Sequence, residues 1–211
     1  MMNKKILTTV LVIAVSVGGV LAFRAFRPDP EATLKSRIAE RSLGSEKAPV
    51  WITEYFDYQC PPCATARLTL EKMMAESPAK FYLQARFFPL PMHKNGMKAA
   101  VFAECASHQK GKFWKFHEEM FSHQNDWATD AYAGFKFTSY AESAGLNIRQ
   151  LEACVQDPET EKSVAEEKKK AEAIGVVMTP SFYVNGKLVV GITKLTEELK
   201  PSAPASEVKA A

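Results

Sequence analysis

The sequence Cys60-Pro61-Pro62-Cys63 constrains this chain more than any other feature does, because of what lies on either side of it. A hydrophobic, aromatic-rich run at 50–58 ends directly before it, and a helical pattern of apolar residues follows it. This order predicts a strand, a tight turn and a helix, with Cys60 at the start of the helix. The two prolines suit a helix start, where a missing N–H costs little, and they stiffen the turn between the sulfur atoms.

The expected position of Cys60 has a chemical consequence. The first turn of a helix carries unpaired backbone N–H groups and the positive end of the dipole, so a thiolate there is stabilised and becomes a better leaving group. A Cys-x-x-Cys pair can also be half of a zinc site, which usually needs a second ligand pair at close spacing. Cys105 and Cys154 are far apart in the sequence, and no paired-histidine motif accompanies them. The context favours a redox pair, with no metal and no separate cofactor.

Length and composition are those of one globular domain. The chain has 211 residues, 46% hydrophobic and 24% charged, which is enough for one core and not for two. The net charge of +3 comes from the N-terminus: the first 27 residues carry four basic side chains and no acidic one, which leaves −1 for the remainder. A nucleic-acid surface would need clustered basic residues on the folded part, so we expect no nucleic-acid partner.

The N-terminal segment, residues 1–23, predicts export. Lys4 and Lys5 precede an uncharged run at 6–23, which is the pattern of an export signal. At about 1.5 Å per helical residue, the run is just long enough to cross a bilayer. It is either a cleaved signal peptide or an uncleaved signal-anchor, and the length of the run favours the anchor. Both interpretations place the rest of the chain across a membrane, and the even number of cysteines agrees with an oxidising compartment.

The rest of the chain divides into three parts. Residues 24–46 are polar and contain two prolines, which predicts a linker with a short amphipathic helix at 31–43. Residues 47–200 carry the strand and helix signals of the folded domain. Residues 201–211 are rich in Pro, Ser, Ala, Glu and Lys, which predicts a disordered tail.

The expected order of elements within the domain is β-α-β, a helical block, then β-β-α. The first two strands are expected at about 50–58 and 81–88, on either side of the helix that follows the cysteine pair. Helical signals continue from about 94 to 173. Asn185-Gly186 between two β-rich runs is a strong signal for a hairpin, and a short helix closes the domain.

With Cys60-Pro-Pro-Cys63 at a strand–helix junction and Thr179-Pro180 before a hairpin, the sequence resembles proteins of the thioredoxin fold. The large helical insertion narrows the resemblance to the DsbA-like thiol:disulfide oxidoreductases of the bacterial envelope. The resemblance covers roughly residues 47–200. It implies an α/β, thioredoxin-like fold with a multi-helix insertion between its two halves.

The resemblance also implies roles for individual residues. Cys60 would be the exposed nucleophile and Cys63 the buried resolving cysteine. Pro180 would be a cis-proline packed against their disulfide, and Thr179 would pair through its backbone with a bound substrate strand. In similar proteins an acid at the position of Glu54 is buried below the active site and helps to move protons to and from Cys63. An outward-facing strand residue is the alternative for Glu54.

Two further sets of residues belong to this interpretation. In similar chains a pair such as Cys105 and Cys154 forms a structural disulfide, and closing this loop of about 50 residues would contribute about 2–4 kcal/mol; the alternative is two separate buried thiols. Apolar residues around the active site would form the substrate groove: Tyr58, Pro61, Pro62, Met178 and Phe182. We expect none of the four histidines to be catalytic: His93, His108, His117 and His123. His93, near the end of a strand, could approach the site.

These features lead us to expect an enzyme that introduces disulfides into exported proteins. The resemblance implies a monomer on the periplasmic or extracytoplasmic side, tethered by its N-terminal segment and reoxidised by a membrane partner linked to quinone. Pro61-Pro62 departs from the Pro-His pair of strong oxidases, and a proline cannot stabilise the thiolate as a histidine would. A disulfide isomerase or reductase therefore remains an alternative, as does a tethered, chaperone-like binding module.

Overall fold

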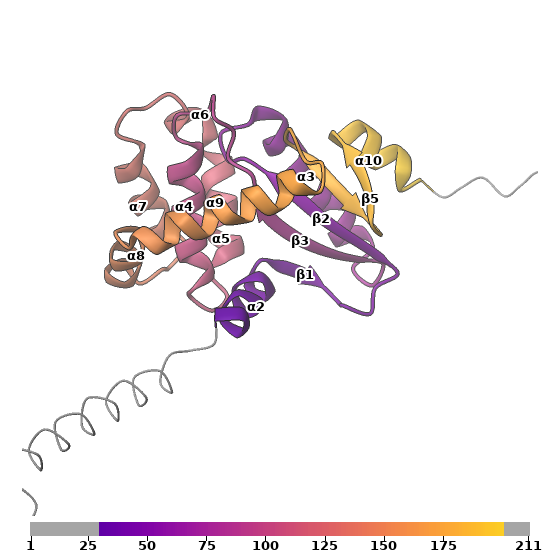
Figure 1. Ribbon diagram of the computed structural model, residues 1–211, viewed down its shortest axis with the longest axis horizontal. Coiled ribbons are helices and arrows are strands. Elements are labelled where there is room, and N and C mark those ends of the chain that lie inside the picture. The colour runs from indigo at the N-terminus through magenta and orange to yellow at the C-terminus, as the bar shows by residue number, and fades with distance from the viewer. Residues whose placement is uncertain (1–29, 201–211) are drawn as a thin grey trace, which may run out of the picture. The chain divides into compact units, whose positions relative to one another are not determined.

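The computed structural model describes residues 30–200 (Figure 1). The predictions for the export segment at 1–23 and for the tail at 201–211 lie outside the described residues. Within the described part of the chain, no helix is both long enough and apolar enough to cross a membrane. The chain divides into two units, Met1–Ser36 and Arg37–Ala211, and helix α2 (Pro30–Glu40) runs from the first into the second.

A five-stranded sheet in the order β1-β3-β2-β4-β5 forms the centre of the second unit. Strands β2 (Val50–Phe56) and β3 (Phe81–Phe87) run parallel, because helix α3 (Pro61–Glu76) crosses back between them. Strand β4 (Ser181–Val184) pairs antiparallel with β2, and β5 (Lys187–Val190) pairs antiparallel with β4. The thioredoxin-like fold class expected from the sequence is confirmed.

The two edge strands of the sheet, β5 and β1, join it in different ways. Between β4 and β5, Asn185 and Gly186 have φ angles of 48° and 87°, as the expected hairpin turn requires. At the other edge, β1 (Ser42–Gly44) pairs antiparallel with β3. This strand lies within residues 24–46, which we expected to be a linker, and at three residues it is too short to leave an alternating pattern. The folded domain therefore begins before the expected boundary.

A buried arginine fixes the segment that leads into β1. Arg41 is 0% exposed, and its guanidinium donates to both carboxylate oxygens of Glu167 on α9, at 3.0 and 2.8 Å. Glu167 also accepts the backbone N–H of Phe87 at 2.8 Å, and Glu104 on α4 lies 3.7 Å from the guanidinium. Arg41 thus anchors this segment to the folded domain, so the segment is not a free tether.

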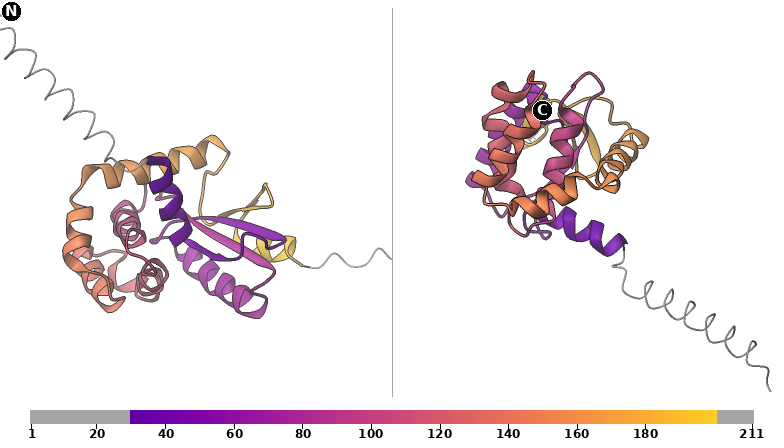
Figure 2. Two further views of the ribbon diagram at one scale, coloured as in Figure 1. Left: turned by 90° about the horizontal axis from the view of Figure 1, so that it is seen from below. Right: turned by 90° about the vertical axis from the view of Figure 1, so that its left-hand side faces the viewer.

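In the helical block, α4 to α8 gather beside one end of the sheet, and α9 runs from there across one face of the sheet (Figures 1 and 2). It lies between β3 and β4, as the sequence predicts. No separate signal in the sequence marks the four-residue α6. The helices are α4 (Gly96–Ser107), α5 (Phe113–Ser122), α6 (Gln124–Trp127), α7 (Ala133–Ser143), α8 (Ile148–Val155) and α9 (Pro158–Ala173).

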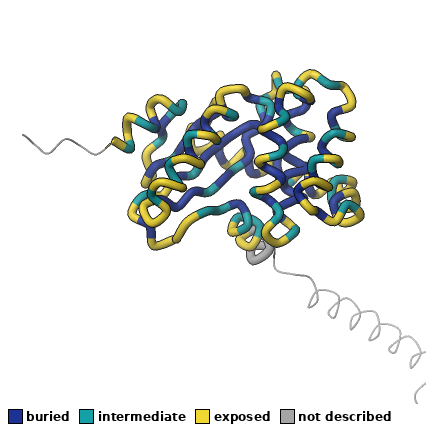
Figure 3. Tube along the Cα trace, turned by 180° about the vertical axis from the view of Figure 1, so that it is seen from behind, coloured by how far each residue is buried: buried dark blue, intermediate teal, exposed yellow. Residues whose placement is uncertain are grey.

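Helices cover both faces of the sheet, and the buried residues follow the strands between them (Figure 3). On one face Ile52 packs with Leu70 of α3 and with Leu195 of α10 (Ile192–Glu198). On the other face Tyr55 packs with Ala171 of α9. Because side chains alternate along a strand, Glu54 shares the face of Ile52 and points toward α3.

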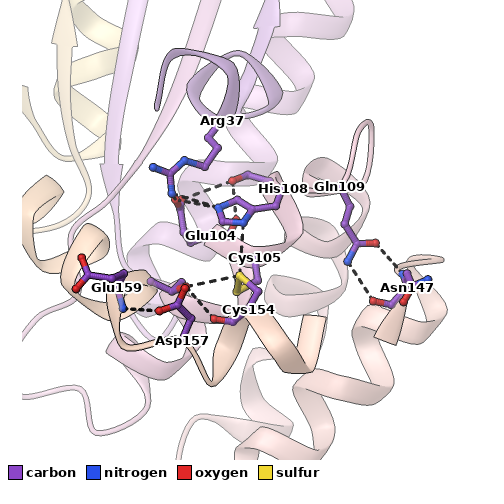
Figure 4. The surroundings of a disulfide bond; sticks show 11 residues. Arg37, Glu104, Cys105, His108, Gln109, Asn147, Cys154, Asp157 and Glu159 are labelled. Atoms are coloured by element: carbon purple, nitrogen blue, oxygen red, sulfur yellow. Dashed lines mark hydrogen bonds and ion pairs between the residues drawn. A yellow bond between two sulfur atoms is a disulfide. The ribbon is translucent and has the colours of Figure 1, made fainter. Parts of the chain in front are cut away.

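A disulfide joins two helices of the insertion (Figure 4). Cys105 on α4 and Cys154 on α8 are 49 residues apart in the sequence, and their Cα atoms are 5.7 Å apart. The alternative of two separate thiols is therefore wrong. Because both sulfur atoms are engaged with each other, neither is free to complete a zinc site with Cys60 and Cys63.

Candidate active site

The two remaining cysteines lie where β2 gives way to α3. Cys60 is the residue before the first helical turn, and Pro61 and Pro62 begin the helix. The backbone N–H of Cys60 donates to the carbonyl of Asp57 at 3.1 Å, and that of Cys63 donates to the carbonyl of Cys60 at 3.0 Å. Both cysteines are thiols in this structure. Local sequence thus places both sulfur atoms at the N-terminus of one helix, as predicted.

Accessibility differs from the expectation for Cys60. Its exposure is 4%, against 0% for Cys63, so it is the more open of the two but not an exposed residue. The loop before β4 accounts for this cover, because the Cys60 thiol lies 3.5 Å from the carbonyl oxygen of Thr179, to which it donates. Pro61 and Pro62 are exposed. The turn between the cysteines is therefore more exposed than either cysteine.

The loop that faces Cys60 carries the second motif. The peptide bond between Thr179 and Pro180 is cis, as the resemblance implied, and Pro180 is buried. The hydroxyl oxygen of Thr179 is buried and has no hydrogen-bond partner. Such an unpaired donor next to a thiol can stabilise that thiol's ionised form. The sequence led us to expect a backbone role for Thr179, and the position of its hydroxyl was not anticipated.

The surroundings push the two thiol pKa values in opposite directions. A hydrogen bond from the Cys63 thiol lowers the pKa of Cys60 to about 6, against the opposing effect of burial. The nearby Thr179 side chain and the backbone N–H of Cys63 lower the pKa of Cys60 further, whereas the negative charge of Asp57 raises it. Burial, followed by the interactions with Cys60, raises the pKa of Cys63 well above its ordinary value. Cys60 is therefore the thiolate at neutral pH and Cys63 the thiol.

Glu54 is buried beneath the cysteines, so the outward-facing alternative is wrong. It is 3% exposed, and burial, followed by the charge on Cys60, raises its pKa to about 8. Its side chain lines a small cavity of about 20 Å³ together with Arg67 of α3 and with Trp114 and His117 of α5. A cavity of this size holds about one water molecule. At neutral pH Glu54 carries a proton close to the two thiols.

A carboxylate that sequence reasoning did not single out anchors the active-site turn. Asp57 accepts the backbone N–H of Gln59 at 2.8 Å and that of Leu90 at 2.7 Å, and the Nδ1 atom of His93 lies 2.7 Å from its Oδ2 atom. The side chain of Asp57 is 0% exposed. Its only signal in the sequence is that it is a charged residue in an otherwise apolar and aromatic run, three residues before Cys60.

An amide side chain on α6 also holds this turn. The Nε2 atom of Gln124 donates to the carbonyl oxygens of Tyr58 and Cys60, at 2.6 and 3.0 Å. Gln124 is 6% exposed, so these bonds form out of contact with bulk water. Sequence reasoning missed this residue because it missed the helix that carries it.

Two residues of the expected substrate groove lie elsewhere. Tyr58 is 1% exposed and Phe182 is 0% exposed, so neither can form part of a surface. The hydroxyl of Tyr58 lies 3.0 Å from Nδ1 of His117, within the core of the insertion. Of the expected apolar groove, Pro61, Pro62 and Met178 are exposed, and the neighbouring Val177 is 73% exposed.

One histidine contacts the Asp57 carboxylate that anchors the active-site turn, and the other three do not. His93 contacts Asp57, as described. Burial lowers the pKa of His117 to about 3, so it stays neutral and cannot act as a general acid at neutral pH. His108 lies beside Glu104 and the disulfide (Figure 4), and the ring of His123 stacks on that of Tyr140.

These features define a class of protein: a thioredoxin fold with a dithiol at the start of a helix, opposite a cis-proline, and a helical insertion between its halves. The chain belongs to the thioredoxin family, whose sequence model, described as "Thioredoxin", matches residues 36–200. This match also begins before residue 47, in agreement with the position of β1.

Individual relatives carry the same fold. The chain is similar to the probable disulfide bond formation protein D of Bacillus cereus, at 27% identity over 157 residues, which is 71% of each chain. The crystal structure of oxidised BdbD from Bacillus subtilis superimposes with a TM-score of 0.66 at 21% identity, over 76% of this chain and 91% of that one. A thioredoxin-like oxidoreductase from Silicibacter pomeroyi gives a TM-score of 0.60 at 27% identity, over 74% and 87%.

A further group of relatives is much longer than this chain. The Na(+)/H(+) antiporter NhaA 1 of Mycolicibacterium vanbaalenii is 34% identical over 151 residues, which is 68% of this chain but 23% of the antiporter. The chain thus spans less than a quarter of the length of this relative. The similarity concerns one part of the longer protein.

Proposed function

We propose that this chain is a DsbA-like protein thiol:disulfide oxidoreductase, which donates a Cys60–Cys63 disulfide to cysteine-containing proteins. The observation that carries the proposal is the difference between the thiols: the pKa of Cys60 is about 6, and that of Cys63 is raised well above its ordinary value. Cys60 therefore acts as the group that exchanges with substrate, because the thiolate is both the nucleophile and the good leaving group. Cys63 acts as the resolving thiol.

The exchange balances in two steps. A substrate thiolate attacks Sγ of Cys60, the Cys60–Cys63 bond breaks, and Cys63 leaves with the bonding electrons. A second substrate thiolate then attacks the substrate sulfur of the mixed disulfide, and Cys60 leaves as a thiolate. The substrate loses two electrons and forms a disulfide, and the enzyme gains them as a dithiol.

Glu54 supplies the proton that the first step needs. Cys63 leaves as a thiolate in a buried position, and burial is the main reason that its ionised form is unfavourable there. Burial likewise raises the pKa of Glu54 to about 8, so at neutral pH its carboxyl is protonated and can give that proton to Cys63. The cavity beside Glu54 has room for a water molecule, through which the carboxyl regains a proton.

The direction of exchange follows from the Cys60 thiolate. A stabilised thiolate exists only in the reduced enzyme, so it favours the reduced enzyme and drives oxidation of the substrate. The Pro61-Pro62 pair contributes no additional group that stabilises the thiolate. The Cys63 thiol lowers the pKa of Cys60 most, burial raises it, and the Thr179 side chain lowers it further. We therefore place the enzyme among oxidants, with an isomerase or reductase as the rival.

Location and partners complete the proposal. We infer that the domain works as a monomer on the extracytoplasmic side of a bacterial membrane, tethered by the N-terminal run. Its clients are exported proteins with cysteines, a membrane protein linked to quinone reoxidises it, and no cofactor beyond the cysteine pair is needed. Three things support this: the uncharged N-terminal run, the Cys105–Cys154 disulfide, which is typical of an oxidising compartment, and the name of the Bacillus cereus relative.

The test follows oxidation of a reduced, unfolded protein that contains one cysteine pair, with the oxidised enzyme in stoichiometric amount. We expect the wild type to transfer its disulfide and Cys60→Ser to transfer none. Cys63→Ser, given the same protein with its disulfide already formed, should attack that disulfide through Cys60 and accumulate a mixed disulfide, with release of one substrate thiolate. His123→Gln, which changes a partly exposed residue outside the site, is the control and should match the wild type. No transfer from the oxidised wild type, together with reduction of the disulfide-bonded protein by its dithiol form, would mean a reductase. Equal binding of the unfolded protein by the wild type and Cys60→Ser, with no transfer by either, would mean a chaperone-like binding module.

A further inference from the structure

We infer that His93 and Asp57 form a charge pair that tunes the cysteine pair, so that protonation of His93 makes the enzyme a stronger oxidant. The inference rests on the proposed function, because it concerns the same disulfide exchange. Both residues are positioning residues: neither touches the reacting sulfur of a substrate, and both act through Cys60.

The contacts of Asp57 place its charge close to Cys60 and hold it there. Its carbonyl oxygen accepts the backbone N–H of Cys60 at 3.1 Å, and its carboxylate accepts three further donors, from Gln59, Leu90 and His93. The carboxylate therefore links the active-site turn to the loop that follows β3. It cannot turn away without leaving two backbone N–H groups unpaired.

Helix α4 packs closely against the carboxylate. A Cβ atom at Gly96, the first residue of α4, would lie 2.9 Å from each oxygen of the Asp57 carboxylate. Gln59 extends the link, since its Oε1 atom accepts the backbone N–H of Asn95 at 2.7 Å. The close approach of α4 thus fixes the carboxylate at a constant position relative to Cys60.

His93 is the group that can change the charge of this pair. Because its Nδ1 atom lies 2.7 Å from a carboxylate oxygen, Nδ1 carries the hydrogen, and a second proton can add only at Nε2. Its side chain is 18% exposed, so protons exchange with water. Histidine is the side chain whose charge ordinarily changes between pH 5 and 8.

The effect on Cys60 has a definite sign. The negative charge of Asp57 opposes the hydrogen bond from Cys63 that lowers the pKa of Cys60. An imidazolium at His93 offsets that negative charge, so the Cys60 thiolate becomes more stable and the reduced enzyme is favoured. By linkage, the reduced enzyme with its thiolate also binds the His93 proton more tightly than the oxidised enzyme does.

The other ionisable groups near the pair do not duplicate this effect. From β2 and α3, Glu54 and Cys63 act on Cys60, and both are protonated at neutral pH, Glu54 with a pKa raised to about 8 by burial and by Cys60. From the turn between α6 and α7, Asp130 is engaged with Lys136 at 2.8 Å. Lys94, a basic residue, adjoins His93 in the sequence.

The decisive variant is His93→Asn. The side-chain amide that this substitution introduces can donate to Asp57 as Nδ1 of the histidine does, but it cannot be charged, so the tether is kept and the titration is removed. His123→Asn is the matched control, because it removes a histidine that lies outside the site. Equilibrium constants against glutathione are measured from pH 5 to 8, and thermal melts establish that each variant is folded.

We expect the wild type and His93→Asn to have the same equilibrium constant at pH 8. Near pH 5.5 the wild type should be the stronger oxidant, by up to roughly threefold in the equilibrium constant, and the difference should shrink at lower pH as Cys60 itself becomes protonated. His123→Asn should follow the wild type throughout. Equal constants for the wild type and His93→Asn at every pH would overturn the inference and leave Asp57 and His93 with a purely structural role.

A second readout separates this inference from the proposed function. Thiolate absorbance of the reduced protein reports the ionisation of Cys60 without any exchange reaction. At pH 5.5 the thiolate fraction should be roughly threefold lower in His93→Asn than in the wild type. If the cysteine pair forms no reversible couple with glutathione, the proposed function fails, and the thiolate fractions still decide the inference. If the couple is reversible and the thiolate fractions agree, the inference alone fails.

Discussion

The hydrogen bond between the two thiols offers the sharpest test of the site's electrostatics. The Cys63 thiol is the largest of the causes that bring the pKa of Cys60 from 9.0 to about 6. Cys63→Ala removes this donor, whereas Cys63→Ser keeps an O–H donor of similar size at the same place. The two variants therefore differ in the one interaction of interest, and both leave Cys60 unable to form the active-site disulfide.

The magnitude follows from the size of the shift. The change from 9.0 to about 6 corresponds to roughly 4 kcal/mol in favour of the thiolate. A hydrogen bond to a charged group contributes about 1.5–3 kcal/mol, which is about one to two pH units. Cys60 in Cys63→Ala should therefore titrate about one to two pH units above Cys60 in Cys63→Ser. The hydroxyl of Thr179 and the backbone N–H of residue 63 supply the lowering that remains.

The assay is the ultraviolet absorbance of the thiolate, followed from acid to alkaline pH. The chain has four cysteines, and Cys105 and Cys154 are joined to each other, so in both variants Cys60 is the one thiol that titrates. Thermal melts establish that the variants are folded. If Cys63→Ala and Cys63→Ser titrate at the same pH, the thiol of Cys63 does not stabilise the thiolate, and the explanation given for the reactivity of Cys60 is wrong.

Three further predictions follow from the same structure. Because the pKa of Cys60 in the folded, reduced protein lies below 9.0, its thiolate contributes stability that is fully present above pH 9 and is lost as the pH falls through about 6. At pH 7 this contribution to the free energy of unfolding is about 1.4 kcal/mol. Denaturant unfolding of the wild type and Cys60→Ser at pH 5 and pH 7 would measure it. Glu54→Gln removes the proton donor, so stopped-flow measurement of mixed-disulfide formation at pH 7 should be slower by roughly 10²-fold, with binding of the substrate unchanged, and an unaltered rate would contradict the proton-transfer role. Arg41→Met removes the bidentate partner of the buried Glu167 carboxylate, which keeps the Phe87 N–H and Arg86 at 3.9 Å, and should lower the free energy of unfolding by about 3 kcal/mol. Lys162→Met, at an exposed ion pair, should change it by less than about 1 kcal/mol.

The fold could be predicted from the sequence where signals are local and repeated. The aromatic run before Cys60 and the apolar helix after it both form as expected, and the Asn185-Gly186 turn forms the hairpin. The short strand at 42–44 could not be found this way, because three residues give no alternation and its pairing with β3 is a tertiary contact. Its segment is held by Arg41, a buried charge that is indistinguishable in the sequence from a surface arginine.

The candidate site divides in the same way. The cysteine pair and Pro180 stand in motifs that are visible along the chain. Asp57 and Gln124 are not visible, because each acts on the active-site turn through a partner distant in the sequence. The exposure of Cys60 was also misjudged, since the loop that covers it begins more than 100 residues later. Residues that hold a site are thus harder to predict than residues that react in it.

The measurement that tests the central claim most directly is the reduction potential of the Cys60–Cys63 pair in the full chain, equilibrated against glutathione buffers. An enzyme that donates disulfides should have a potential near the roughly −120 mV end of the range for this chemistry. The lowered pKa of Cys60 predicts a value toward that end. A value near roughly −270 mV would mean that the pair is held reduced and works as a reductase, and it would contradict the proposed direction of exchange.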